Sequence, residues 1–479
     1  MTSIPEQQKV WRYVNLLNNS DRVLLIVIFR VGEWLPQDHR VLREWLQDTI
    51  QASDSKRDQE LHPSVYALWQ AIESDARLYM LFNSMFDELP TKKPYRNDPD
   101  GHHQIRDCHH MCQVLNYLLT CAPAWTHRDY VSRTVGLPFN AMFDWPMGTP
   151  SGWAAFLDPT VNEHLKEILN HWGTYLQTPA SANVLGDDKR GWLGLEGKKE
   201  LTRVANEAYG TNSKFEELFI CKPHEQYHGF TSWDNFFTRQ YRDGIRPVAE
   251  PDNNDVLANP CESKPYRVAT GVSAKEEFWV KGQPYSVRSM LAQDELADFF
   301  VGGTVYQAFL SALSYHRWHS PVSGTVVKQY VVPGTYFSEP LFTGMADPDG
   351  PDPFGEGTGQ AYLSSVATRA IIFIEADNPK IGLICVMPIG MVEVSTCDVT
   401  VKEGQRIQKG EQLGMVSFSQ IAHHKAHPQM RQRVLTMSAS STLEARPIVF
   451  FSAKASRLKD FRRLAIGRTC LYGVSLAES

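Results

Sequence analysis

The sequence predicts an α+β fold, in which a helical amino-terminal part precedes a strand-rich part. Three observations predict it. Apolar residues recur at helical spacing from about residue 8 to about residue 210. Beyond about residue 250, short β-branched runs alternate with Gly, Pro and Asp, which is typical of strands. The chain has 479 residues, of which 42% are hydrophobic, so it is long enough for two or three domains with filled cores.

The helical part is assigned to residues 1–214. Its loops carry Gly and Pro, as at 148–152, and its apolar residues are spaced three and four apart, which places them on one face of each helix. Two such sets are Val41, Leu42, Trp45 and Leu46, and Leu165, Ile168, Leu169, Trp172 and Leu176.

One segment of the helical part is rich in metal-ligand residue types. Cys108 and Cys112 are four residues apart on an expected helix that continues through Leu115 and Leu118, so both are expected to face the core. No second Cys/His pair follows at a zinc spacing, which favours packing over metal binding. The eight cysteines of the chain are scattered, which indicates a reducing compartment. The residues of this segment are His102, His103, Cys108, His109, His110 and Cys112.

The strand-rich part is assigned to residues 215–415. Strands are expected at 324–332, 370–374 and 381–387, where β-branched residues cluster. The stretch 227–247 before them is aromatic and basic, and it either joins the two parts or lines a site.

Charge and hydropathy exclude several classes of protein. A formal net charge of −6 gives no electrostatic footprint for nucleic acid. The first nine residues lack the pattern of a signal peptide, and the early apolar run 23–29 is too short to span a bilayer. A cytoplasmic protein without stable membrane insertion is therefore expected, and its oligomeric state, a homo-oligomer included, is left open.

The last segment, 416–479, differs in charge from the rest. It carries ten Lys and Arg against three Asp and Glu, whereas the preceding residues carry 38 against 51. Two hypotheses account for it: a genuine tail, or translation of an unspliced intron or shifted frame, because the codons of Val416 and Ser417 can spell a splice donor. Sequencing the transcript across codon 415 distinguishes them.

Two histidines carry the strongest chemical signal. His316 and His319 stand just before the turn-forming residues 320–324. Histidine exchanges protons near neutral pH, so such a pair suits a general base. On spacing alone, two structural histidines bonded to the backbone remain the alternative.

The context of these histidines resembles the phosphatidylserine decarboxylase family. Residues 315–324 read Tyr-His-Arg-x-His-x-Pro-x-x-Gly and 332–337 read Val-Pro-Gly-x-x-Phe, as in that family, and four further motifs follow the family's order. The helical part, at 34–41, 171–173, 181–186 and 191–193, resembles the extra domain of a fungal branch that includes L-tryptophan decarboxylases. The four further motifs are at 236–247, 281–291, 389–394 and 404–414.

The resemblance implies a self-processing enzyme with a β-rich pyruvoyl-decarboxylase catalytic domain. In the family, an internal serine attacks the preceding carbonyl, and the ester then eliminates to leave a pyruvoyl group, which is the electron sink for decarboxylation. By position, His319 would be the base for self-cleavage and His316 a nearby proton donor or substrate contact. Glu262 stands where many members have Asp and would hold and polarise the histidine.

The chain departs from the family at the cleavage site. After Met415 the family has an aromatic residue and then Gly-Gly-Ser-Ser or Gly-Ser-Thr, whereas residues 416–421 here contain no glycine. A displaced serine is the hypothesis: Ser440 as the pyruvoyl precursor, with Ser441 as the alternative. An ordinary Ser/Thr-rich loop is the other interpretation.

The expected function is decarboxylation of a soluble, aromatic amino acid after self-cleavage, with the pyruvoyl group as cofactor. The first rival is phosphatidylserine decarboxylation, which needs membrane docking, yet no basic amphipathic helix precedes the tail. The others are an unprocessed, inactive relative and a non-catalytic carrier. Residues 401–414 resemble a biotinyl or lipoyl domain, but no lysine stands in the modification context.

Overall fold

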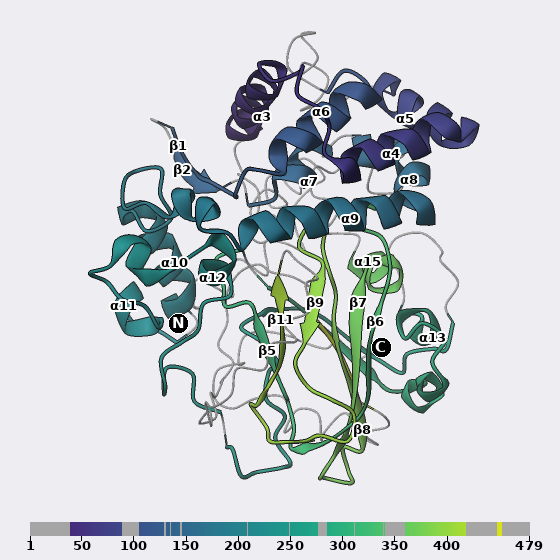
Figure 1. Cartoon of the computed structure of the whole chain (residues 1–479). Helices are drawn as coiled ribbons and strands as arrows, with labels where there is room; N and C mark the ends of the chain where they lie inside the picture. The colour runs from purple at the N-terminus through teal and green to yellow at the C-terminus, as the bar shows by residue number, and fades with distance from the viewer. Residues whose placement is uncertain are drawn as a thin grey trace, which may run out of the picture.

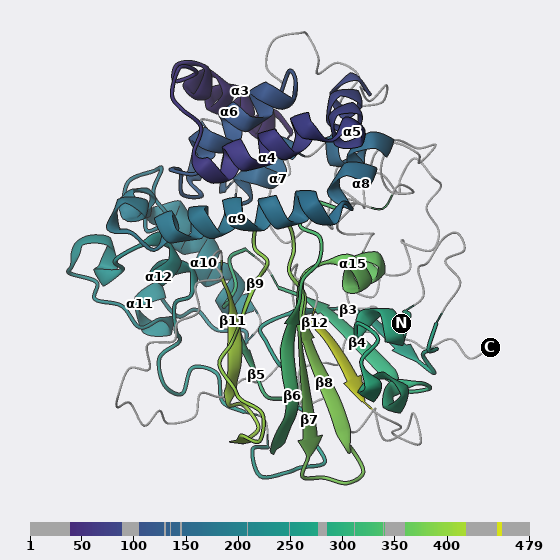
Figure 2. The ribbon, with the colours of Figure 1, turned by 45° about the vertical axis from the view of Figure 1, so that its right-hand side comes forward.

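The computed structural model confirms a mixed α+β architecture. Helices of the amino-terminal half form a layer across the ends of the strands, and α9 (Pro159–Leu176) lies against those ends (Figure 1). Figure 2 gives the same arrangement from a second side. The described residues are 39–88, 105–128, 131–134, 136–143, 146–207, 209–248, 250–275, 285–310, 312–338, 340, 360–417 and 448–452.

Eleven further α-helices and four short 3-10 helices have their bounds in the described residues. The α-helices are α3 (His39–Asp54), α4 (Pro63–Ser74), α5 (Ala76–Asp87), α6 (Cys108–Leu118), α7 (Pro138–Phe143), α8 (Pro150–Phe156), α10 (Leu195–Glu207), α11 (Phe215–Leu218), α12 (Trp233–Phe237), α13 (Val287–Met290) and α15 (Gln360–Val366). The 3-10 helices are η4 (Pro146–Gly148), η5 (Pro179–Leu185), η6 (Gln226–Gly229) and η7 (Glu295–Phe300).

The strands form three antiparallel sheets. A hairpin pairs β1 with β2, a seven-stranded sheet has the order β10-β6-β7-β8-β12-β4-β3, and a three-stranded sheet has the order β5-β11-β9. The bounds are β1 (Trp125–Arg128), β2 (Val131–Thr134), β3 (Lys264–Thr270), β4 (Thr304–Phe309), β5 (Arg317–His319), β6 (Gly324–Val332), β7 (Arg369–Ala376), β8 (Leu383–Pro388), β9 (Thr396–Val399), β10 (Arg406–Ile407), β11 (Gln412–Ser417) and β12 (Ile448–Ser452).

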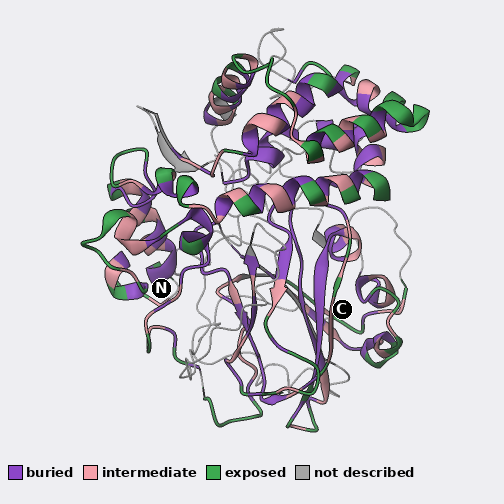
Figure 3. Cartoon of the chain, viewed as in Figure 1, coloured by how far each residue is buried: buried purple, intermediate pink, exposed green. Residues whose placement is uncertain are grey.

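The sequence of α9 determines where this helix begins and which of its faces is buried. Asp158 caps its start by accepting hydrogen bonds from the amides of Thr160 and Val161, and Pro159 occupies the first turn, where no donor is needed. The expected apolar face is buried from Leu165 to Leu176, and Figure 3 shows exposed residues on the outward side of the helix. The helix therefore covers the strand ends with one continuous apolar stripe.

The large sheet is buried on both faces, which explains the unbroken apolar run in β7. Ile372 and Ile374 point into the core shared with the helices, whereas Ile371 and Phe373 point into a second core under the other face. The three predicted strands are confirmed as β6, β7 and β8.

The helical layer and the strands share one core. The rings of Phe143 and Phe337 lie 4.9 Å apart, and the Tyr336 amide donates to Asn162 Oδ1 at 3.1 Å. The carboxylate of Glu393, which is buried, accepts a hydrogen bond from the Phe139 amide in α7 at 2.8 Å. The two parts of the chain are thus joined by polar as well as apolar contacts.

The cysteine-rich segment packs into the core as expected. Cys108 and Cys112 lie on α6 and are buried, and a hydrogen bond with the thiol of Cys108, together with burial, raises the pKa of Cys112. Among the described residues, no group of three or more His, Cys, Asp and Glu side chains is placed to hold a metal ion. His102 and His103 lie outside the described residues.

Residues after Met415 take part in the sheets. The strand β11 continues to Ser417, and β12 pairs antiparallel with both β4 and β8. The expected boundary after Met415 therefore falls inside a strand, and part of the segment 416–479 belongs to the large sheet.

Within the described parts of the chain, no helix is both long and apolar enough to cross a membrane.

Candidate active site

The histidine segment is held in place by its backbone. The His319 amide donates to the Pro260 carbonyl at 2.7 Å, and the Ser320 amide donates to the Glu411 carbonyl at the same distance. The Gly410 amide donates back to the Ser320 carbonyl at 2.7 Å. Two segments far apart in the sequence, at 260–263 and 410–415, therefore meet at the predicted histidines.

His319 is arranged as a neutral base. Its Nδ1 lies 2.8 Å from the Gly410 carbonyl oxygen, which can only accept, so Nδ1 carries the proton and Nε2 keeps its lone pair. The side chain is buried, and Nε2 has no hydrogen-bond partner among the described residues. Burial lowers the pKa of His319 to about 4, so the ring is uncharged at neutral pH.

His316 lies on an aromatic platform. Its ring stacks on Phe237 at 3.8 Å between centroids, and its Nδ1 lies 3.3 Å from the Phe237 carbonyl oxygen. The side chain is fully buried. The aromatic and basic stretch before the strands, which was expected to join the parts or line a site, thus contributes Phe237 to the site.

Glu262 is near the histidines but does not bind their rings. Its carboxylate accepts hydrogen bonds from the Tyr241 hydroxyl at 2.7 and 2.8 Å, from Arg246 Nη2 at 2.8 Å and from the Tyr315 amide at 3.2 Å. The prediction that Glu262 directly holds and polarises His319 is wrong, because the backbone carbonyl of Gly410 takes that position. Glu262 instead anchors the chain at Tyr315, one residue before His316.

Tyr241 and Arg246 complete this anchor, and sequence reasoning missed both as site residues. Arg246 Nη2 also donates to the Tyr241 hydroxyl at 3.0 Å, and its guanidinium lies over the Tyr241 ring. Burial opposes the charge of Arg246, but the carboxylate of Glu262 outweighs it and the pKa of Arg246 is raised. The available signal was the family-like motif at 236–247, which contains both residues.

The strand β11 brings the expected cleavage region to the histidines. Met415 pairs with Arg317, and the Val416 amide donates to the His316 carbonyl at 3.0 Å. Gly414 is required here, because a Cβ would lie 2.5 Å from the Trp318 ring and 2.3 Å from the Asp398 carbonyl. The chain that follows Met415 thus begins beside His316.

The two candidate serines are not placed by the structure. Ser440 and Ser441 lie outside the described residues, between the end of β11 and the start of β12. Lys281 and Gly282 of the family-like motif at 281–291 also lie outside them.

The buried, uncharged state of His319 predicts a stability that depends on pH. An unfolded histidine binds a proton below about pH 6.5, whereas the folded chain binds it only near pH 4. As the pH falls from about 6.5 to about 4, folding is therefore expected to lose up to about 3 kcal/mol through this residue.

Urea unfolding at pH 7, 5 and 4 measures this loss. The matched variant is His319→Asn, whose amide can donate to the Gly410 carbonyl but does not titrate. The free energy of unfolding of the variant, relative to the native chain, should rise as the pH falls. A constant difference across this range would contradict the prediction.

The chain is similar to known decarboxylases over most of its length. Two sequence profiles described as phosphatidylserine decarboxylase match residues 62–201 and 233–421. The decarboxylase iboD of Amanita muscaria is 42% identical over 299 residues, which cover 61% of this chain and 84% of that protein. The L-tryptophan decarboxylase of Psilocybe cyanescens is 36% identical over 406 residues, or 81% of this chain and 86% of that protein. Phosphatidylserine decarboxylase proenzyme 3 of Schizosaccharomyces pombe is 30% identical over 191 residues, or 40% of this chain and 18% of that protein.

Proposed function

Because this chain belongs to the phosphatidylserine decarboxylase family and is a carboxy-lyase, we propose that it decarboxylates an aromatic amino acid after cleaving itself at a serine. The observation that carries the proposal is His319, a buried imidazole whose Nε2 keeps its lone pair and whose backbone pairs with Gln412 at the start of β11.

The residues of the site fit a pyruvoyl group. His319 Nε2 is a buried acceptor without a partner among the described residues, as a base for a serine hydroxyl requires. When formed, the pyruvoyl group would supply the electron sink for loss of carbon dioxide. His316 and His319 are the residues that would lie beside the pyruvoyl group.

The position of β12 supports a serine just before it. Ile448 pairs with Pro388 and with Ala308, so β12 enters the large sheet at the end where β8 leads into Met391. Ser441 stands seven residues before Ile448, a span of at most about 25 Å. We propose Ser440 as the pyruvoyl precursor, with Ser441 as the alternative.

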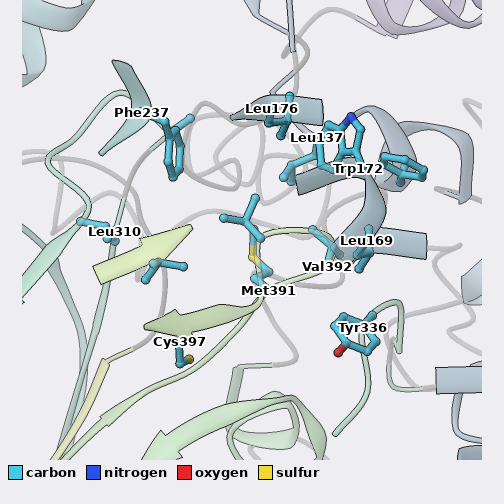
Figure 4. Close-up of a cluster of buried hydrophobic side chains, with 14 of the residues drawn as sticks. Leu137, Leu169, Trp172, Leu176, Phe237, Leu310, Tyr336, Met391, Val392 and Cys397 are labelled. Carbon is cyan, nitrogen blue, oxygen red and sulfur yellow. The ribbon is translucent and has the colours of Figure 1, made fainter. Parts of the chain in front are cut away.

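The surroundings of His316 favour an aromatic substrate. Phe237, which stacks on His316, lies in an apolar cluster with Leu137, Leu176 and Met391 (Figure 4). Such walls exclude water from a reaction in which charge is lost as carbon dioxide leaves. They also match the planar side chain of the substrate named for the Psilocybe relative.

The histidines have separate tasks in this proposal. His319 takes the hydroxyl proton of the serine at Nε2 during self-cleavage, while Gly410 fixes the tautomer. Decarboxylation of an amino acid releases carbon dioxide and consumes one proton, which must reach the carbon that lost the carboxylate. His316, fixed by the Phe237 carbonyl and ring, is the proposed donor of that proton or a contact of the substrate.

Mass spectrometry of the purified protein and release of carbon dioxide test the proposal together. Two chains, the shorter blocked by pyruvoyl at its amino terminus, are expected, with carbon dioxide and the matching amine formed from L-tryptophan. One intact chain that releases no carbon dioxide would overturn the proposal and indicate an inactive relative. Release from phosphatidylserine vesicles alone would establish the lipid-acting rival.

A further inference from the structure

One buried side chain near this site has no hydrogen-bond partner among the described residues. Asn140 lies on α7 and is fully buried, yet neither Nδ2 nor Oδ1 has a hydrogen-bond partner among the described residues. Other buried asparagines are satisfied: Asn206 donates to the Ser213 carbonyl and accepts from Thr211 and the Ser213 amide. Because an unpaired buried amide is costly, Asn140 requires a partner that the described part of the chain does not provide.

Backbone contacts tie Asn140 to the site. Its amide donates to both oxygens of the buried Glu393 carboxylate, at 3.3 and 3.2 Å. Glu393 follows Val392, whose φ of 46° is strained for a β-branched residue. Three residues later, Thr396 pairs with Ser417 of β11. Asn140 is therefore attached, through one short turn, to the strand that neighbours β11.

Asn140 lies three residues after Leu137, which belongs to the same apolar cluster. Leu137 begins this helical turn, since its carbonyl accepts from the Ala141 amide at 2.9 Å, and residues three apart share a helix face. Leu137 lies with Met391 and Phe237 in the cluster of Figure 4, and Phe237 stacks on His316. Asn140 is thus a polar residue one helical turn from a member of this apolar cluster.

We propose that Asn140 determines substrate specificity by binding the polar edge of an aromatic side chain, such as the ring N–H of an indole. The amide oxygen would accept from that N–H, while the aromatic and aliphatic walls would cover the ring faces. This inference rests on the proposed function, because it names the part of the substrate that the same site recognises. A site built to pair a ring N–H rejects analogues that lack it.

The test measures binding, so it does not depend on turnover. The probes are indole-3-propionate and its benzothiophene analogue, in which sulfur replaces the ring N–H; neither has an amine. Calorimetry of the native chain should show at least about tenfold tighter binding of the indole probe. Asn140→Leu should bind the two probes equally and should melt no lower than the native chain, because it removes an unpaired amide.

Asn206→Leu is the matched control. It removes a satisfied buried amide, so it should lower the melting temperature and keep the preference for the indole probe. An unchanged preference in Asn140→Leu, or equal binding of both probes by the native chain, would overturn the inference. The two tests have separate outcomes. If Asn140→Leu loses the preference for the indole probe but the native chain releases no carbon dioxide, the inference stands and the proposed activity is overturned.

Discussion

Replacing His319 by alanine is expected to leave the protein as a single uncleaved chain and to slow maturation by about a thousandfold. The Nε2 of the neutral imidazole has no hydrogen-bond partner among the described residues, and His319 pairs with Gln412 of β11. Without this imidazole, the serine hydroxyl would have to lose its proton unaided. The fraction of cleaved chain, followed over time by denaturing electrophoresis and mass spectrometry, measures the effect.

Two variants separate catalysis from folding. His319→Asn keeps a donor for the Gly410 carbonyl and should fold like the native chain, yet remain uncleaved. His224→Ala removes an exposed histidine and should be cleaved at the native rate. Cleavage of His319→Ala at the native rate would show that another group is the base.

Replacing Arg246 by methionine is expected to destabilise the fold by about 3–5 kcal/mol, because it leaves a buried carboxylate without its cation. The side chains of Arg246 and Glu262 are only 2% and 9% exposed. Urea unfolding measures the loss. The double variant Arg246→Met with Glu262→Gln should recover part of it, since the neutral amide needs no cation.

Arg288→Met is the matched control for this pair. Arg288 forms a two-bond pair with Asp298, but the two side chains are 43% and 61% exposed, so the change should cost at most about 1 kcal/mol. A loss in Arg246→Met no larger than that in Arg288→Met would contradict a structural role for the anchor.

The sequence predicted those features that depend on local pattern. The apolar stripe of α9, the three strands β6, β7 and β8, and the burial of Cys108 and Cys112 on one helix are all found. The family-like motifs also singled out His316 and His319, the two histidines of the proposed site. In each case neighbouring residues alone set the period or the turn.

Contacts between distant segments could not be predicted in the same way. Glu262 was paired with the wrong group, because its distance from Arg246 and Tyr241 depends on how three loops fold together. His319 is held by the backbone carbonyl of Gly410. Every residue has such a carbonyl, so the residue types in the sequence do not reveal this contact. Asn140 gave no signal either, since an unpaired amide is recognised only once its surroundings are known.

The strand β12 was missed for a different reason. Its five residues, Ile-Val-Phe-Phe-Ser, have the β-branched and aromatic composition of a strand. The basic composition of the segment 416–479 suggested that it was foreign to the domain. The average charge of these 64 residues concealed the short apolar run of β12, which pairs with both β4 and β8.

Because β12 lies between β4 and β8, cleavage at Ser440 or Ser441 would cut a connection without removing a strand. The shorter product would remain bound by main-chain ladders on both sides, as in strand complementation. Its departure would expose two open sheet edges, which are prone to aggregate. The mature enzyme should therefore elute as one particle under native conditions and separate into two chains only in denaturant.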